Sequence, residues 1–200
     1  MIMQEQANAE APKATPAVRG THHKFMLLPP MPQHVRWFAL GPLSLGLEMR
    51  VLTDKNGLPK ETSISLHIFG NDRTTEYLRF DCFDRFPHYH YILNASQTNV
   101  VWGYDPDANG PMLEWSFAAI RSRMPQFLRR AGEAKLADQV EREGLDLAAI
   151  DAVREAIDTY EPKVPSAEAL AETRDWMIGW KATHPQFNTA AGQEFLAFID

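Results

Sequence analysis

The period of the apolar residues changes once along this chain, at Pro111, and this change constrains the fold more than any other feature. Before Pro111, apolar and polar residues alternate in short runs, as at Ile64, Leu66 and Ile68. After it, apolar residues recur at the spacing of a helix. Alternation is typical of strands with one buried face, and a period near 3.6 is typical of amphipathic helices. The sequence therefore predicts an α+β fold in which a sheet precedes a set of helices.

Turn signals divide the strand region. Gly41-Pro42 interrupts one apolar run, Asp54-Lys55-Asn56-Gly57 has the Asn-Gly pair that tight hairpins favour, and Gly70-Asn71-Asp72 ends the next run. We expect an antiparallel meander of five to six strands over about residues 34–104, packed against a C-terminal set of about four helices. One face of such a sheet is apolar and the other is mixed polar.

The chain divides into three parts that share one core. Residues 1–32 are rich in Ala, Pro and Glu and are expected to form a disordered or extended N-terminal arm. Residues 33–110 form the sheet, and residues 111–200 form the helical part that packs on it.

Helix signals place several boundaries in the second half. Residues 105–111 are expected to be loop, and Pro125 is expected to kink or restart the first long helix. Ser166 is expected to cap a helix over 167–183. The five tryptophans are expected to lie mostly in the core, and the apolar segment Phe195 to Ile199 is a candidate docking segment.

The stretch Tyr77 to Tyr91, YLRFDCFDRFPHYHY, concentrates the polar chemistry and reads as a β-hairpin. Alternation places Arg79 and Asp81 on one face and Cys82 on the other. With a four-residue loop, Asp81 would lie across from His90, and Phe83 would lie across from His88. A slip of one residue would instead place Cys82 beside the histidines.

His88 and His90 share one strand face, which is the spacing that lets two imidazoles share a metal ion. Asp81 on the paired strand would complete a site of two histidines and one carboxylate, suited to one divalent transition metal such as iron, manganese or zinc. His67 faces the same way and is a further candidate ligand. Arg79, Asp81 and His90 are the candidate catalytic residues, with Arg79 orienting an anionic substrate.

Two other interpretations of the same residues stay open. They could form a metal-free binding or acid–base site, or a buried network of Arg79, Asp81 and His90 that only specifies the sheet.

A second cluster is basic. It consists of Arg121, Arg123, Arg129 and Arg130, and no acidic residue lies between Glu114 and Glu133. The cluster is a candidate patch for an anion or an acidic partner segment.

Composition excludes several classes of function. The net charge of −6 argues against a protein whose main task is to hold nucleic acid. The single cysteine excludes an internal disulfide and a cysteine-based metal cage. No apolar run is long enough to cross a bilayer, and the N-terminus lacks a signal-peptide pattern, so we expect a cytoplasmic protein.

The run YLRFDCFDRFPHYHYI, together with WFALGPLSLGLEMRVL upstream, resembles an uncharacterised bacterial domain of unknown function built around an RFDCF…PHYHY core. The resemblance covers roughly residues 34–130. It implies that Arg79, Asp81, His88 and His90 matter together, and it implies no activity.

Three functions follow as hypotheses. The first is a cytoplasmic binding or accessory protein that acts through a protein partner or a homo-oligomer. The alternative is a small metal-dependent enzyme of the hydrolase or oxygenase type that uses the His-x-His strand. The second alternative is a nucleic-acid-related component of a toxin–antitoxin pair. The sequence does not decide between an enzyme and a binding protein.

Overall fold

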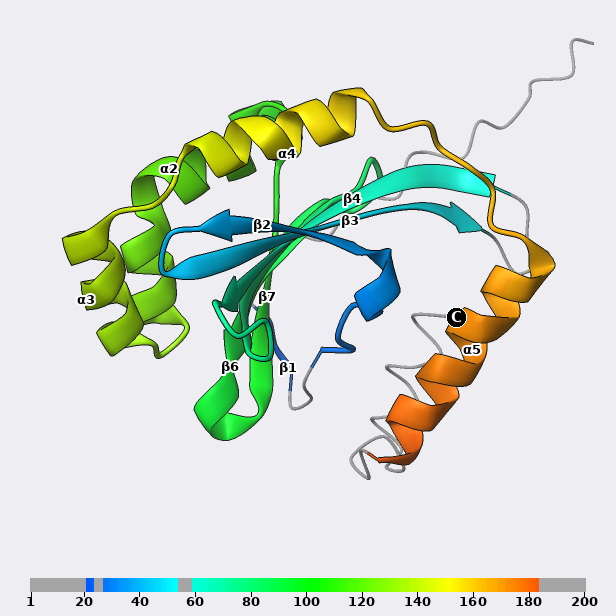
Figure 1. The fold of residues 1–200 in the computed structure, drawn as a ribbon, viewed down its shortest axis with the longest axis horizontal. Helices are drawn as coiled ribbons and strands as arrows, with labels where there is room; N and C mark the ends of the chain where they lie inside the picture. The colour runs from blue at the N-terminus through cyan, green and yellow to red at the C-terminus, as the bar shows by residue number, and fades with distance from the viewer. Residues whose placement is uncertain (1–20, 24–26, 54–58, 184–200) are drawn as a thin grey trace, which may run out of the picture.

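A computed structural model describes residues 21–23, 27–53 and 59–183 of the chain. Within them, seven strands form one sheet (Figure 1). The strands are β1 (Thr21–His23), β2 (Val35–Leu40), β3 (Leu43–Thr53), β4 (Pro59–Gly70), β5 (Glu76–Cys82), β6 (His88–Leu93) and β7 (Thr98–Gly103).

Every strand pairs antiparallel with its neighbours, in the order β1-β7-β6-β5-β4-β3-β2. Strands β2 to β7 follow one another as a six-stranded meander, which confirms the α+β prediction for residues 34–104. The seventh strand was not expected. Thr21–His23 lies within the predicted N-terminal arm, and it extends the sheet by pairing with β7 at its far edge.

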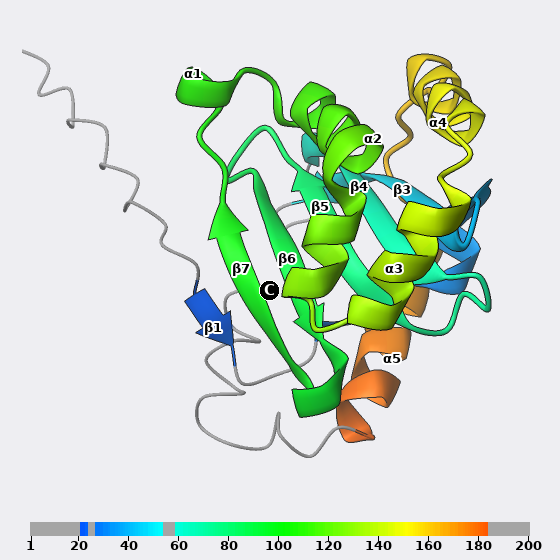
Figure 2. The same ribbon diagram turned by 90° about the vertical axis from the view of Figure 1, so that its left-hand side faces the viewer.

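In the part of the chain that the structure describes, five α-helices follow the sheet, and two short 3₁₀ turns precede or interrupt it. The α-helices are α1 (Pro106–Asn109), α2 (Met112–Arg130), α3 (Ala134–Glu143), α4 (Ala148–Asp158) and α5 (Ala167–Ala182), and the 3₁₀ turns are η1 (Pro32–His34) and η2 (Asn94–Ser96). Figure 2 shows α2 and α3 lying in front of the sheet. Within the described residues, no helix is long and apolar enough to cross a membrane.

The core lies between the apolar face of the sheet and helices α2, α3 and α4. Phe80 on β5 is 1% exposed, and its ring packs against the rings of Tyr89, Trp115 and Phe127. Burying a side chain of this size contributes about 1.5–3 kcal/mol. This packing holds the apolar face of β5 and β6 against α2. Because side chains alternate along a strand, the intervening residues of both strands point to the opposite face of the sheet.

Two local predictions for the helical part were wrong. Helix α2 runs through Pro125 as one continuous helix, so the predicted restart does not occur, and Met124 and Leu128 on either side of the proline are buried in the core. The predicted loop at 105–111 contains the one-turn helix α1, because Asp105 accepts hydrogen bonds from the backbone N–H groups of Asp107 and Ala108.

Helix α5 differs from the other long helices in its position. Its cap is as predicted, since the Ser166 hydroxyl accepts a hydrogen bond from the backbone N–H of Ala169. The helix lies on the opposite side of the sheet from α2 and α3 (Figures 1 and 2). None of its residues is buried. The prediction that the tryptophans lie mostly in the core is therefore wrong for Trp176 and Trp180, which are only partly buried. Trp37, Trp102 and Trp115 are also only partly buried.

Several predictions fall outside the described residues. They concern the 1–20 segment, the turn at Asp54 to Gly57 and the segment Phe195 to Ile199.

Candidate functional site

The polar face of the sheet is buried and carries most of the titratable side chains of the interior. Its buried polar members are Ser44, Glu48, Ser63, Ser65, His67, Glu76, Asp81, His90 and Asn99. Buried polar groups are costly unless they are paired, so their partners decide what this face can do.

The hairpin register differs from the predicted one. Asp81 lies opposite His88, whereas Arg79 lies opposite His90, a shift of two residues. The reason is that the loop between Cys82 and His88 is longer than four residues; within it, Phe86 adopts a positive φ of 54° before Pro87. A shift of two residues preserves the face of every side chain, so Asp81 still faces both histidines.

Asp81, His88 and His90 form a compact cluster. The Oδ2 atom of Asp81 lies 3.3 Å from Nε2 of His88 and 3.2 Å from Nε2 of His90. One ligand atom from each of the three residues lies within 4.8 Å of the others. The structure thus brings together three of the four residues that the sequence nominated as metal ligands.

The second nitrogen of each imidazole is already engaged. Nδ1 of His88 lies 2.7 Å from the carbonyl oxygen of Phe86, and Nδ1 of His90 lies 3.1 Å from Oδ1 of Asn99. Because a carbonyl oxygen only accepts, each Nδ1 carries the proton and donates. In a neutral imidazole this leaves the lone pair on Nε2, and both Nε2 atoms point at Asp81.

The other oxygen of Asp81 is also held. The Ser65 hydroxyl on β4 donates to Oδ1 of Asp81 over 2.6 Å, and both residues are buried. Ser65 lies directly opposite Asp81 in the sheet, so the strand register itself sets this contact. Oδ2 is therefore the oxygen that faces the histidines.

The surroundings keep Asp81 ionised. Burial would raise the pKa of its carboxyl group, but His90 and His88, when Nε2 carries a proton, and the charge of Arg79 together hold this pKa well below its ordinary value. Burial also lowers the pKa of His88, although the Asp81 carboxylate opposes that shift. A negative charge thus lies beside an imidazole whose burial disfavours a proton on Nε2.

His67, the fourth nominated ligand, belongs to a neighbouring network. Its Nδ1 lies 2.7 Å from Oε1 of Glu76, and its Nε2 lies 3.6 Å from Oε2 of Glu48. Arg79 donates two hydrogen bonds to Glu76, of 2.9 and 2.7 Å, and one to the backbone oxygen of Leu28. The guanidinium of Arg79 is thus engaged with Glu76 and Leu28.

The sequence interpretation missed Glu48 and Glu76. Glu48 could have been found, because alternation along β3 places it on the face of Ser44 and Gly46. Glu76 could not have been found from the sequence, because strand alternation from Leu78 places Glu76 on the apolar face. An irregularity in the register between Ile68 and Phe69 pairs Glu76 with Phe69 and turns its carboxylate toward the polar face.

Cys82 lies on the helix side of the sheet, as alternation predicted. Its sulfur lies 3.6 Å from the Ser116 hydroxyl of α2. Burial raises the pKa of its thiol to about 12, so little thiolate is present near neutral pH.

The predicted arginine patch is largely balanced by acids that are distant in sequence. Arg121 pairs with Asp151, and Arg129 pairs with Asp138 and Glu141. The guanidinium of Arg130 lies over the rings of Tyr91 and Trp102, and Arg123 is exposed. The absence of acids between Glu114 and Glu133 was misleading because α3 and α4 supply the carboxylates.

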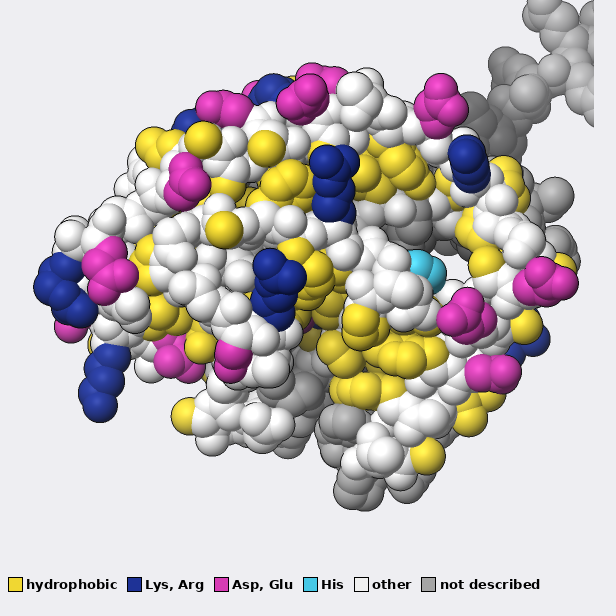
Figure 3. Space-filling model, viewed as in Figure 1, with side chains coloured by type: hydrophobic (Ala, Val, Ile, Leu, Met, Phe, Trp, Pro, Cys, Tyr) yellow, Lys and Arg dark blue, Asp and Glu magenta, His cyan; other side chains and the backbone are white. Residues whose placement is uncertain are grey.

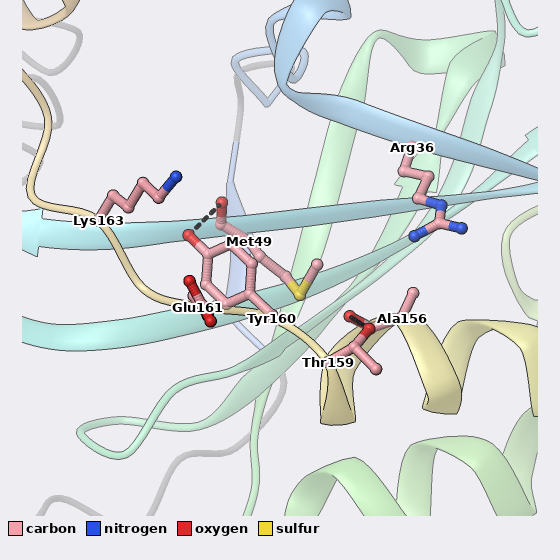
Figure 4. A pocket seen from close by; sticks show the side chains of 7 residues that line it. All are labelled: Arg36, Met49, Ala156, Thr159, Tyr160, Glu161 and Lys163. Atoms are coloured by element: carbon pink, nitrogen blue, oxygen red, sulfur yellow. Dashed lines mark hydrogen bonds between the residues drawn. The ribbon is translucent and has the colours of Figure 1, made fainter.

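A groove of about 450 Å³ lies elsewhere, between α4 and the β2–β3 edge (Figure 4). Its lining residues are Arg36, Met49, Ala156, Thr159, Tyr160, Glu161 and Lys163. The Tyr160 hydroxyl donates to the backbone oxygen of Met49. Glu161 is the single carboxylate in this lining, which contains no histidine or cysteine, so the groove lacks the donors that the Asp81 cluster provides.

Comparison with known proteins identifies the family. The family model described as Domain of unknown function (DUF7700) matches residues 37–157, more than half of the chain. The chain belongs to this family. The match covers the Asp81 cluster and helices α2 to α3, as well as nearly all of α4. No curated protein and no solved structure matches the chain.

Proposed function

We propose that this member of the DUF7700 family binds one divalent transition-metal ion through Asp81, His88 and His90 and uses it in catalysis. One observation carries the proposal: the Nε2 atoms of both imidazoles converge on Oδ2 of Asp81, while each Nδ1 already donates to an oxygen. This pattern, in which a second partner fixes the tautomer of each histidine ligand, is typical of metal sites.

Electrostatics support a bound cation. Two imidazole lone pairs and a carboxylate oxygen repel one another unless a proton or a metal ion lies between them. The burial of His88 lowers its pKa and so disfavours the proton.

The two distances from the Asp81 oxygen to the imidazole nitrogens also suit a metal ion. Two ligand atoms that each lie about 2.1 Å from one ion are about 3.0 Å apart at an octahedral angle and about 3.4 Å apart at a tetrahedral angle. The observed separations of 3.2 and 3.3 Å fall between these values.

Three protein ligands favour a catalytic role over a structural one, because structural zinc sites are closed by four protein ligands. The His88 side chain is 24% exposed, so a water or substrate can reach the cluster from that side. Zinc in this donor set would support hydrolysis by lowering the pKa of a bound water, and ferrous iron would support oxidation. The chain itself holds the donors: Phe86 and Asn99 orient the imidazoles, and Ser65 orients the carboxylate.

Metal analysis of untagged protein tests the proposal. We expect about one equivalent of zinc, iron or manganese per chain after purification or after reconstitution and desalting. The variant His88→Gln/His90→Gln should lose the metal, whereas His34→Gln, which removes an exposed histidine in η1, should retain it. Less than a tenth of an equivalent in the wild type under both conditions would contradict the proposal.

Binding of a protein partner, the first hypothesis from the sequence, is a second candidate that helix α5 favours. This helix has no buried residue, and Ile178 on it is 56% exposed. Figure 3 shows a hollow between the region of α5 and the body of the protein, with hydrophobic side chains on its walls. Light scattering, with and without Trp176→Ala/Ile178→Ala, tests self-association through this helix. A monomer in both proteins would contradict the homo-oligomer.

Three further predictions from the sequence concern the cellular location, the source organism and the toxin–antitoxin hypothesis. A cytoplasmic location and a bacterial source stay predictions. The toxin–antitoxin hypothesis loses support, because acids in α3 and α4 pair with Arg121 and Arg129.

A further inference from the structure

Ser65 holds the one oxygen of Asp81 that does not face the histidines. We infer that Ser65 is a positioning residue that makes Asp81 a one-oxygen ligand and thereby favours a transition-metal ion over calcium. The inference rests on the proposed metal site. It adds that the Ser65 hydroxyl determines which kind of metal ion the site prefers.

The geometry of the contact is that of a strong hydrogen bond. The Ser65 hydroxyl donates to Oδ1 over 2.6 Å, in the range of a hydroxyl bonded to an ionised carboxylate. Ser65 is 2% exposed and Asp81 is 6% exposed, so bulk water does not compete for Oδ1. Both strands are internal to the sheet and the two residues are directly paired, so the backbone ladder holds their side chains next to each other on one face.

The contact has a direct consequence for the metal. With Oδ1 engaged, the cluster offers one oxygen and two imidazole nitrogens. Calcium takes six to eight oxygen ligands and often binds carboxylates through both oxygens. Zinc, iron, cobalt and manganese accept imidazole nitrogens and a single carboxylate oxygen. If the serine hydroxyl is removed, the carboxylate can turn and present both oxygens, so the selectivity should fall.

The chain contains a matched control for this serine. Ser63 lies two residues earlier on β4, on the same face, and is 1% exposed. Within the described residues, its hydroxyl has no hydrogen-bond partner. Ser63→Ala thus removes the same atom from the same strand face without touching Asp81.

The experiment titrates cobalt(II) into metal-free, full-length protein and records both the dissociation constant and the visible absorption spectrum. Wild type and Ser63→Ala should give the same constant and spectrum. Ser65→Ala should bind cobalt about 10–100-fold more weakly, the usual effect of losing a partner of a metal ligand. It should also show an altered spectrum and bind calcium more competitively. Ser65→Thr, which keeps the hydroxyl, should restore the wild-type spectrum.

Two failures are distinguishable. If the wild type binds no cobalt, both the metal site and this inference are overturned. If the wild type binds cobalt and Ser65→Ala matches it in constant, spectrum and calcium competition, the inference alone is overturned. If Ser65→Ala does not fold, Ser65→Val, which matches Ser65→Thr in shape but lacks the hydroxyl and adds no metal ligand, replaces it in the same comparison.

Discussion

Asp81 lies directly opposite His88 across strands β5 and β6, and its Oδ2 atom lies 3.3 Å from Nε2 of that histidine. His90, two residues further along β6 on the same face, approaches the same oxygen at 3.2 Å. Because antiparallel neighbours on one face are close, this placement follows from the register. One carboxylate oxygen is thereby shared by two imidazoles.

Replacing this carboxylate by its neutral isostere separates its charge from its shape. Asp81→Asn keeps the size of the side chain but removes the charge that a cation requires. We expect at least about a 100-fold loss of cobalt(II) affinity, by comparison with the 10–100-fold effect of losing an outer partner. Calorimetric titration measures this change. Asp84→Asn, in the exposed loop of the same hairpin, is the control and should bind like the wild type.

The faces of the site residues could be predicted from sequence because they depend only on alternation. The predicted register was off by two residues, yet Asp81, His88 and His90 still shared a face, since the side-chain period of a strand is two. Partners that depend on long-range pairing could not be predicted this way. Asn99 meets His90 only because β7 pairs with β6.

Glu76 shows the limit most clearly. Local alternation assigns it to the apolar face, and a register irregularity opposite Phe69 reverses that assignment. In the helical part, the helix does not restart at Pro125, for a related reason. The packing of Met124 and Leu128 in the core outweighs the local preference of proline, and local sequence does not report tertiary packing.

The pair of Glu76 and Arg79 should be sensitive to the loss of one partner. Arg79→Met leaves the buried Glu76 carboxylate with His67 as its remaining cationic partner, and we expect a loss of about 3–5 kcal/mol in unfolding free energy. Urea unfolding measures it. Glu76→Leu/Arg79→Met, which leaves neither charge, should cost less than the sum of the two single changes.

The control for this prediction is an exposed arginine that has two carboxylate partners, one more than Arg79. Arg129 pairs with Asp138 and Glu141 at the surface, where solvent screens the ion pairs, so Arg129→Met should destabilise the protein far less than Arg79→Met. Equal effects of Arg79→Met and Arg129→Met would contradict a role for burial.

Two phenylalanines near the hairpin test whether its apolar face anchors the site. Phe80 is 1% exposed and packs on α2, whereas Phe86 is 72% exposed. Phe80→Ala should cost about 3–5 kcal/mol, as expected for an emptied core position. Phe86→Ala should change the unfolding free energy by less than about 0.5 kcal/mol. Thermal or urea unfolding of both variants gives the comparison, and a small effect of Phe80→Ala would contradict the assigned core.

His67 should make the stability of the protein depend on pH. Burial alone would lower its pKa, but the carboxylates of Glu76 and Glu48 raise this pKa above the ordinary value of 6.5. Arg79 opposes the rise, and Glu76, whose own pKa is lowered to about 2, stays ionised near neutral pH. The folded state thus binds the proton of His67 more tightly than the unfolded state does.

The sign of the effect follows by linkage. A raised pKa contributes stability that is fully present below pH 6.5 and is lost as the pH rises through the folded-state pKa. The excess stability of the wild type over His67→Gln should therefore be larger at about pH 6 than at about pH 9, by about 1.4 kcal/mol for each unit of the pKa shift. Urea unfolding at both pH values measures this difference. His34→Gln, at an exposed position, should show no such dependence, and a pH-independent effect of His67→Gln would contradict the raised pKa of this imidazole.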